Sequence, residues 1–133
     1  MNISEAAAES GVPAKTIRYY EDIGLVRPPR LANGYRVFGA AELAALAFIG
    51  RARSLGFSVE DCRTLLALEQ GGTSHDVKVI AEEHLTRIAA KIAELEAMRG
   101  TLKALVSRCR GDDGADCPIM DDLRRPAHAT HAA

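Results

Sequence analysis

The stretch from Lys15 to Arg36 decides the fold, and it reads KTIRYYEDIGLVRPPRLANGYR. Its first part has the length of about two helical turns and carries Lys, Thr, Arg and a pair of Tyr. A Pro28-Pro29 break follows, and then an Asn33-Gly34 dipeptide, which is the strongest short signal for a tight hairpin. A basic helix followed at once by a basic hairpin predicts one surface that binds a nucleic-acid duplex.

The residues before this stretch predict the first half of a helix-turn-helix. Ser4 can cap a short Ala-rich helix that continues to Glu9, and Gly11 ends it. Pro13 then fits the first turn of a second helix that runs to about Asp22, because a first-turn residue needs no N–H donor. Two short helices joined by so short a turn have helix-turn-helix spacing.

The residues that follow predict a wing and two supporting helices. The segment from Arg27 to Phe38 is expected to form a two-stranded wing. Apolar residues recur at helical spacing over about 41–54, and Ser58 can cap another helix that ends near Glu69. Residues 1–70 are therefore expected to form a winged helix-turn-helix DNA-binding domain in a mainly α protein.

A long apolar seam follows a Gly-rich turn. It steps mainly by three and four residues, which predicts one helix over residues 74–108 and a coiled coil about 45 Å long. The seam consists of Val77, Ala81, Leu85, Ile88, Ile92, Leu95, Leu102 and Leu105. The alternative is a helix packed on its own domain, but nothing else in the chain has a comparable length. We therefore expect an antiparallel coiled-coil homodimer.

The chain has three cysteines, and two of them bracket an acidic, Gly-rich loop. Cys109 and Cys117 are separated by seven residues, and Pro118 can begin a short helix whose positive end favours a thiolate on Cys117. Two thiolates without a third Cys or His nearby suit Cu(I) better than tetrahedral Zn(II). The segment 109–123 is thus interpreted as a metal-binding loop with a short helix.

Other interpretations of these cysteines remain open. Cys109 and Cys117 could be idle thiols or form a loop disulfide, and oxygen ligands from the loop could complete a divalent-metal site. We interpret those acidic residues, Asp112, Asp113 and Asp116, as solvated turn residues. Cys62 shares a helical face with neighbouring apolar residues, which predicts a buried core thiol.

The candidate DNA contacts belong to the second helix and the wing. Arg18 is the best candidate for base readout, because its fork matches guanine, and Tyr35 and Arg36 are expected to bind phosphates. The full candidate set is Lys15, Thr16, Arg18, Tyr19, Tyr20, Tyr35 and Arg36. Of the two adjacent tyrosines, we expect one to be buried and one to contact the DNA backbone.

Charge and composition limit the class of protein. The net charge is −1, but residues 11–40 carry five Lys or Arg against two Asp or Glu, and local charge density sets phosphate affinity. No apolar run approaches the length that spans a bilayer, and the N-terminus has no leader pattern, so a cytoplasmic protein without membrane contact is expected. No catalytic grouping is evident, so an enzyme is not expected. The tail over 124–133 is expected to be disordered.

Taken together, these motifs resemble the MerR family of bacterial transcription regulators and, within it, the copper-efflux regulators of the CueR type. The resemblance covers about residues 1–123. Residues 16–21, 24–26 and 33–36 look like the family's winged helix-turn-helix, and residues 109–118 look like the metal loop of the copper subgroup.

The resemblance implies a function. It implies that Cys109 and Cys117 bind Cu(I), or Ag(I) or Au(I), and that Ser74 occupies the position where divalent-metal members place a third Cys. It also implies a dimer that binds promoter DNA together with RNA polymerase and distorts the duplex when metal binds. A divalent sensor of Zn, Cd, Hg or Pb is the alternative within the family. A thiol metal-trafficking protein is the alternative from another class.

Overall fold

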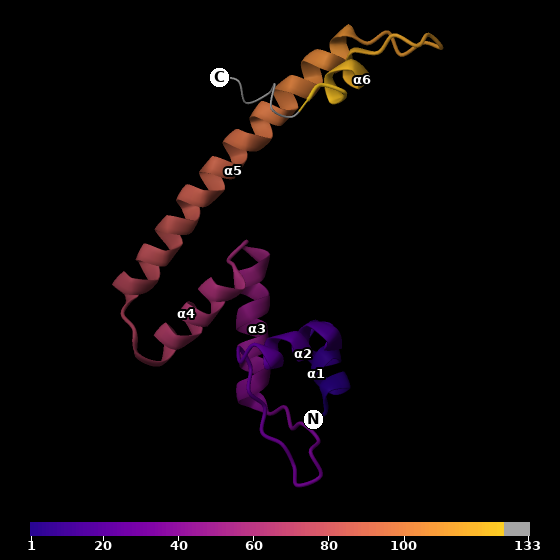
Figure 1. The fold of residues 1–133 in the computed structure, drawn as a ribbon. Coiled ribbons are helices and arrows are strands. Elements are labelled where there is room, and N and C mark those ends of the chain that lie inside the picture. The colour runs from indigo at the N-terminus through magenta and orange to yellow at the C-terminus, as the bar shows by residue number, and fades with distance from the viewer. Residues whose placement is uncertain (127–133) are drawn as a thin grey trace. The chain divides into compact units, whose positions relative to one another are not determined.

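The structure, a computed structural model, describes residues 1–126, and six helices lie in that part of the chain (Figure 1). They are α1 (Ile3–Ser10), α2 (Ala14–Asp22), α3 (Ala40–Ser54), α4 (Val59–Gly71), α5 (Ser74–Arg108) and α6 (Pro118–Leu123). No strand is present among the described residues, so the prediction of a mainly helical chain is confirmed. None of these helices combines the length and apolar character that crossing a membrane requires.

The chain divides into two compact units, and the first comprises residues 1–82. In this unit α1 packs against α2 and α3, and α3 packs against α4. The side chains of Ile17, Leu46, Ile49 and Cys62 are fully buried where these helices meet. The predicted core positions of Ile17 and Cys62 are therefore confirmed, and the apolar face of α2 is fixed against the core, which leaves its polar face outward.

The caps of the helices agree with the sequence in one case and differ in another. The Ser58 side chain accepts a hydrogen bond from the Asp61 backbone N–H at 3.0 Å, as predicted for the start of α4. The cap of α1 is Asn2 rather than Ser4: its side chain accepts from the Glu5 N–H at 2.8 Å, and the Glu5 carboxylate accepts from the Asn2 N–H at 3.2 Å. This reciprocal capping box satisfies two N–H groups at once, which Ser4 could not do.

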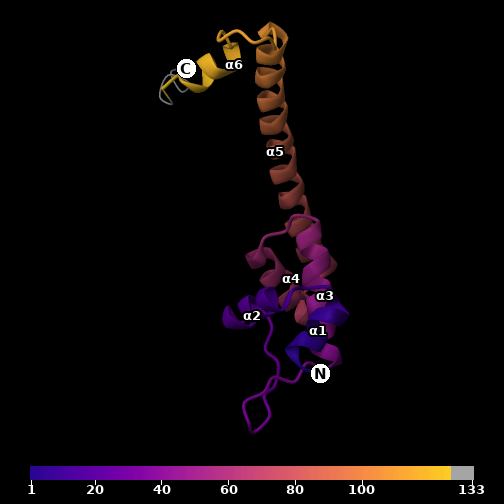
Figure 2. The same ribbon diagram turned by 90° about the vertical axis from the view of Figure 1, so that its right-hand side faces the viewer.

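The wing has the predicted turn but not the predicted pair of strands. The segment between α2 and α3 projects from the helices in Figures 1 and 2, and Gly34 at its tip has φ +87°. Only a single bridge, Arg30 with Arg36, joins its two sides. Pro28 and Pro29 lack the N–H groups that a longer ladder would need, so the hairpin cannot extend toward α2.

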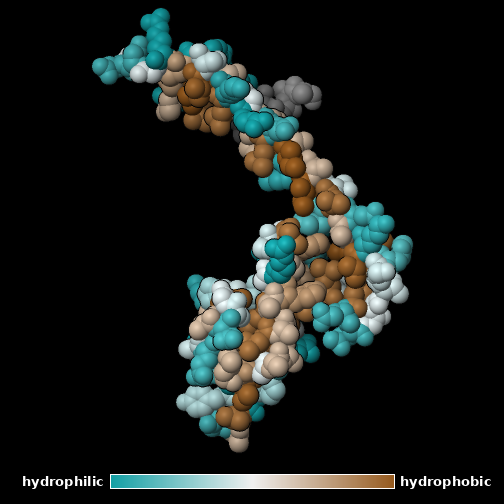
Figure 3. All heavy atoms as spheres, turned by 180° about the vertical axis from the view of Figure 1, so that it is seen from behind, coloured by the Kyte–Doolittle hydropathy of each residue, from teal (hydrophilic) through white to brown (hydrophobic). Residues whose placement is uncertain are grey.

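The second unit begins at residue 83 and contains most of α5. The bounds of α5 coincide with the predicted 74–108. Many apolar side chains of this helix are exposed, among them Leu85 (64%), Ile92, Leu95 and Leu102, and Figure 3 shows hydrophobic side chains on its surface. A helix with so much exposed apolar surface lacks a covering element in this unit.

Helix α6 lies beside the C-terminal end of α5 in Figures 1 and 2. Leu105 of α5 is only 4% exposed, and a surface hollow of about 510 Å³ between the two helices is lined by Arg108, Pro118 and Asp122 among others. The predicted start of a short helix at Pro118 is confirmed. The predicted disordered tail falls largely on residues 127–133, which lie outside the described part.

Candidate nucleic-acid interface and metal-binding loop

The outer face of α2 carries the candidate DNA contacts. Lys15, Arg18 and Tyr19 are exposed, and Thr16 is half-buried. Ile17 and Tyr20, on the inner face, belong to the core. This division follows from the helical period, since residues three apart share one face. The result is a short helix that presents a basic and aromatic surface to solvent.

The two adjacent tyrosines have different surroundings. Tyr19 is 51% exposed, whereas Tyr20 is only 7% exposed and packs in the core, with the ring centroids 6.0 Å apart. One buried tyrosine was expected, and it is Tyr20. Its place among the candidate DNA contacts is therefore corrected: burial leaves almost none of its side chain available to a duplex, and Tyr19 remains the candidate.

An ion-pair cluster joins α2 to the wing. The Glu21 carboxylate accepts hydrogen bonds from Arg36 Nε, at 2.9 Å to Oε1 and 2.8 Å to Oε2, and from Arg30 at 2.7 Å. The Glu21 side chain is 14% exposed, so the pair is partly shielded from water. Arg36 thus has a structural partner in addition to its candidate role at phosphate.

Sequence reasoning missed the role of Glu21. The available signal was its position, because Glu21 is one of two adjacent acidic residues at the end of the basic helix and precedes the arginines of the wing. An acidic side chain on a surface that binds phosphate reduces affinity unless it is neutralised by a partner. The distance between Glu21 and the wing, however, depends on how the hairpin folds back, which the sequence does not specify.

The tip of the wing presents Tyr35. The Asn33 side chain accepts a hydrogen bond from the Tyr35 N–H at 3.1 Å, and Arg30 donates to the Gly34 carbonyl at 2.8 Å. These bonds hold a tight turn in which Tyr35 is 70% exposed. An exposed tyrosine on this turn, followed directly by Arg36, is well suited to contact a phosphate backbone.

The loop that follows α5 brings the two predicted cysteines together. Cys109 Sγ and Cys117 Sγ are 3.8 Å apart, and both thiols are free and half-buried. This separation is far longer than a disulfide bond of about 2.05 Å, so no disulfide joins the two residues. Two sulfur atoms at this separation are close enough to bind the same ion.

The start of α6 favours the thiolate of Cys117, which is its N-cap residue. The backbone N–H of Met120 lowers the pKa of Cys117 below 9.0, and the Cys109 thiol and the Ile119 N–H act in the same direction. Desolvation and the Asp121 carboxylate oppose this effect. The net direction agrees with the prediction that the helix N-terminus stabilises negative charge at Cys117.

The acidic residues of the loop show one clear structural role. Asp112 accepts a hydrogen bond from the Gly114 N–H at 2.9 Å, and Gly111 has φ +66°. This is the geometry of an Asx turn, which supports the interpretation of Asp112 as a turn residue. Within residues 1–126, no cluster of three or more His, Cys, Asp or Glu is arranged to hold a metal ion.

A helix-turn-helix with a basic outer face, followed by a long helix and a cysteine loop, defines a DNA-binding regulator. Comparison with protein families identifies which one. Residues 1–69 match the family described as "MerR HTH family regulatory protein", and residues 43–105 match that described as "MerR, DNA binding". The chain belongs to the MerR family of helix-turn-helix transcription regulators.

Two relatives are similar to this chain over nearly their whole length. The regulator HmrR of Rhizobium leguminosarum bv. viciae is 54% identical over 125 residues, covering 92% of this chain and 97% of the relative. The regulator CueR of Salmonella typhimurium is 44% identical over 131 residues, covering 96% and 95%. Among solved structures, PbrR691 of Ralstonia metallidurans CH34, in complex with lead(II), has a TM-score of 0.78 at 27% identity and covers 92% of this chain and 98% of that one.

Proposed function

We propose that this protein is a Cu(I)-responsive transcription regulator that binds promoter DNA as a homodimer and activates copper-efflux genes. The observation that carries the proposal is the Cys109–Cys117 pair of free thiols, with sulfur atoms 3.8 Å apart at the N-terminus of α6. The similarity to HmrR and CueR supports a regulator over a thiol metal-trafficking protein or an enzyme.

The chemistry of the two donors favours a monovalent ion. Thiolates are soft ligands, which Cu(I) prefers, and Ag(I) and Au(I) share this preference. Two thiolates and one monovalent cation sum to a single negative charge, which the N–H groups at the start of α6 offset. Ser74, at the first position of α5, provides no thiolate to complete a site for a divalent ion.

The DNA-binding role is assigned to the outer face of α2 and to the wing. Lys15, Thr16, Arg18 and Tyr19 would enter the major groove, and Tyr35 and Arg36 would contact phosphates. Arg18 is exposed and is the proposed reader of a guanine. The promoter would be shared with RNA polymerase, which places the protein in the cytoplasm.

The homodimer is proposed from the apolar surface of α5. Ile92, Leu95 and Leu102 are each more than half exposed, at 51%, 52% and 52%. Because each is already about half buried, covering the rest contributes about half of the 1.5–3 kcal/mol that full burial provides, before the cost of association. A second copy of the same helix offers a surface of equal length and matching spacing, which supports an antiparallel pair.

The proposed activation mechanism is a metal-dependent change in promoter shape. Promoter elements that are too widely spaced for RNA polymerase would be realigned by bending and undertwisting of the duplex. For metal to move the protein from mostly inactive to mostly active, it must favour the activating conformation by about 5 kcal/mol. In this scheme Cys109 and Cys117 hold the ion, and α5 and α6 connect the loop to the rest of the dimer.

The second candidate function is a divalent-metal sensor of the Zn, Cd, Hg or Pb type. The observation in its favour is the similarity to PbrR691, whose structure contains lead(II). The sequence of this chain is only 27% identical to that of PbrR691, whereas it is 54% identical to HmrR and 44% identical to CueR. Those two identities favour the copper hypothesis.

A promoter-transcription assay with purified protein, RNA polymerase and a panel of buffered metal ions tests the proposal. We expect activation with Cu(I), and with Ag(I) or Au(I), but not with Zn(II), Cd(II), Hg(II) or Pb(II). Activation by a divalent ion in the absence of a Cu(I) response would replace the copper hypothesis with its alternative. No response to any metal, with promoter binding intact, would reject metal sensing.

A further inference from the structure

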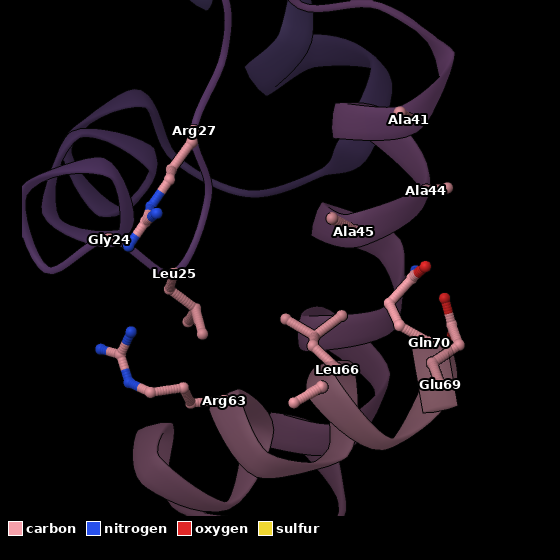
Figure 4. Close-up of a pocket in the computed structure, with 11 residues that line it drawn as sticks. Gly24, Leu25, Arg27, Ala41, Ala44, Ala45, Arg63, Leu66, Glu69 and Gln70 are labelled. Atoms are coloured by element: carbon pink, nitrogen blue, oxygen red, sulfur yellow. The ribbon is translucent and has the colours of Figure 1, made fainter. Parts of the chain in front are cut away.

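A surface cleft in the DNA-binding unit has no role in the proposed function. Its volume is about 610 Å³, within the range of about 300–1,000 Å³ that is usual for binding sites. The segment after α2 and the helices α3 and α4 form it, as Figure 4 shows. Neither the candidate DNA contacts nor the cysteine pair lines this cleft.

The two ends of the cleft differ in charge. Arg27 and Arg63 lie at the end formed by Gly24 and Leu25, whereas Glu69 lies at the opposite end (Figure 4). Between them the floor is apolar: it is formed by Leu25, Leu66 and the alanines of α3. An occupant would therefore place an anionic group at the arginine end and an apolar group on the floor.

The arginine end is built by specific contacts. Gly24 has φ +74°, and a Cβ at this position would lie 3.2 Å from an Arg27 guanidinium nitrogen, so the glycine leaves room for that side chain. Arg63 donates a hydrogen bond to the Ile23 carbonyl at 2.8 Å, and its Nε lies 3.6 Å from the exposed Glu60. Arg63 is therefore held in place, although Glu60 neutralises part of its charge.

Arg27 is the available cation of the cleft. Its side chain is exposed, and no carboxylate within residues 1–126 pairs with it. A guanidinium offers a planar fork of donors that matches a carboxylate.

The exposure of the cleft indicates the kind of occupant. Arg27, Ala41, Ala44 and Glu69 are all exposed, so the cleft is an open groove and not an enclosed pocket. An open groove would leave much of a small molecule in water, whereas sites for small molecules usually bury most of the ligand. A peptide segment lying across the groove could contact both the arginine end and the apolar floor.

We propose that this cleft binds an acidic, apolar-containing segment of a protein partner in the transcription machinery, with Arg27 as the principal contact for a carboxylate. The identity of the partner rests on the proposed function, since an activator meets RNA polymerase at the promoter. The carboxylate end of the segment lies at Arg27 and Arg63, because Glu69 repels it from the other end.

Fluorescence anisotropy with a short labelled peptide of Glu and Leu tests the site on the full-length dimer without added metal. Arg27→Glu and Ala44→Asp should each weaken peptide binding at least about 10-fold, which corresponds to about 1.4 kcal/mol. Arg27→Lys keeps the charge and should weaken it less. Lys15→Glu is the control variant, and it should lose duplex affinity but keep peptide affinity. Arg27→Glu should lose peptide affinity but keep duplex affinity.

Three results would overturn the proposal. Equal peptide binding by wild type and Arg27→Glu would remove the site. Loss of duplex affinity in Arg27→Glu would make Arg27 a DNA contact, and displacement of the peptide by glutarate at low concentration would make the occupant a small acid. Failure of the copper proposal can be told apart from failure of this one. If the wild-type protein does not respond to Cu(I) but still binds the peptide through Arg27, the copper proposal fails and the cleft proposal stands.

A transcription assay then tests the assigned partner. With saturating metal, Arg27→Glu should lower activated transcription several-fold at unchanged promoter affinity. If peptide binding is lost while transcription is unaffected, the partner is not part of the transcription machinery, and that assignment is overturned.

Discussion

At the scale of single residues, we propose separate roles for the cysteines: Cys109 and Cys117 bind the metal, and Cys62 belongs to the core. Cys109→Ser and Cys117→Ser each remove one of two metal donors, so we expect Cu(I) affinity to fall by more than about 100-fold, since even supporting residues contribute up to that factor. Metal-dependent transcription should be lost, and binding to the promoter should be retained. Anaerobic Cu(I) competition titrations and electrophoretic mobility shifts measure the two properties separately.

Cys62→Ala is the matched control for these variants. The Cys62 side chain is fully buried in the core of the first unit, and burial raises the pKa of its thiol. A buried neutral thiol does not bind metal readily. We expect a normal metal response with a modest loss of stability, and a lost response in this variant would make the assignment to Cys109 and Cys117 incomplete.

The lowered pKa of Cys117 gives a pH prediction. Because the start of α6 lowers the pKa of Cys117, its thiolate should persist into the pH range in which an ordinary thiol is already protonated. The stability that this group contributes is fully present above its unfolded pKa and is lost as the pH falls through the folded pKa. Iodoacetamide alkylation, followed by mass spectrometry of the peptide containing Cys117, measures the midpoint. A midpoint at or above that of an unfolded reference would contradict the prediction.

Some residues were assigned correctly from the sequence, and others required the structure. The core position of Ile17 follows from the helical period, and the cap at Ser58 follows from its local sequence. The choice between Tyr19 and Tyr20 depends on the angle at which α2 packs on the core, which no local pattern specifies. The same limit applies to Glu21, whose partners come from a hairpin that folds back on the helix.

At the scale of elements, the pairing of α2 with the wing is testable through Glu21. Glu21→Gln removes the charge that Arg30 and Arg36 share, so we expect a loss of about 1–2 kcal/mol in the free energy of unfolding. Duplex affinity should also change, because the wing loses its fixed orientation. Urea denaturation and fluorescence anisotropy measure the two effects.

Glu60→Gln is the matched control for that variant. Its pair with Arg63 has a separation of 3.6 Å, and the Glu60 side chain is 80% exposed. Exposed pairs of this kind contribute about 0–1 kcal/mol. If both variants lose the same stability, the ion-pair cluster at Glu21 does not have the structural role that we assign to it.

The elements differ in how far the sequence predicts them. The bounds of α5 were predicted because a long seam and two flanking breaks define them. The wing was predicted as two strands, yet its prolines allow only one bridge. The N-cap of α1 is Asn2 and not the predicted Ser4, because Asn2 and Glu5 form two mutual hydrogen bonds. Local hydrogen bonding therefore determines the wing bridge and the cap of α1, whereas the order of the helices could be predicted from the sequence.

At the scale of the whole molecule, the central expectation is a dimer through α5. Ile92→Glu combined with Leu95→Glu places two charges in the proposed seam, and we expect the protein to become monomeric at micromolar concentration and to lose promoter binding. Analytical ultracentrifugation measures the mass. A matched pair of substitutions at the exposed polar residues Glu94→Gln and Glu96→Gln should leave the dimer intact, and an unchanged mass in the Ile92/Leu95 variant would reject this interface.

The cleft and the cysteine loop lie in different compact units, and we propose different ligands for them. The cleft could not be predicted from the sequence, because its lining residues come from three separate segments. The meeting of Cys109 and Cys117 beside a helix start could be predicted, because the two cysteines and Pro118 lie in one short segment. A site built from one segment is visible in the sequence, whereas a site between helices requires the fold.

X-ray absorption spectroscopy of the copper-loaded protein tests the central claim most directly, since it counts the atoms bound to the metal. We predict two sulfur ligands and no nitrogen or oxygen ligand, with the metal signal lost in Cys109→Ser and Cys117→Ser. Three or four coordinating atoms, or an unchanged spectrum in either variant, would contradict the assignment of this cysteine pair as a two-coordinate Cu(I) site.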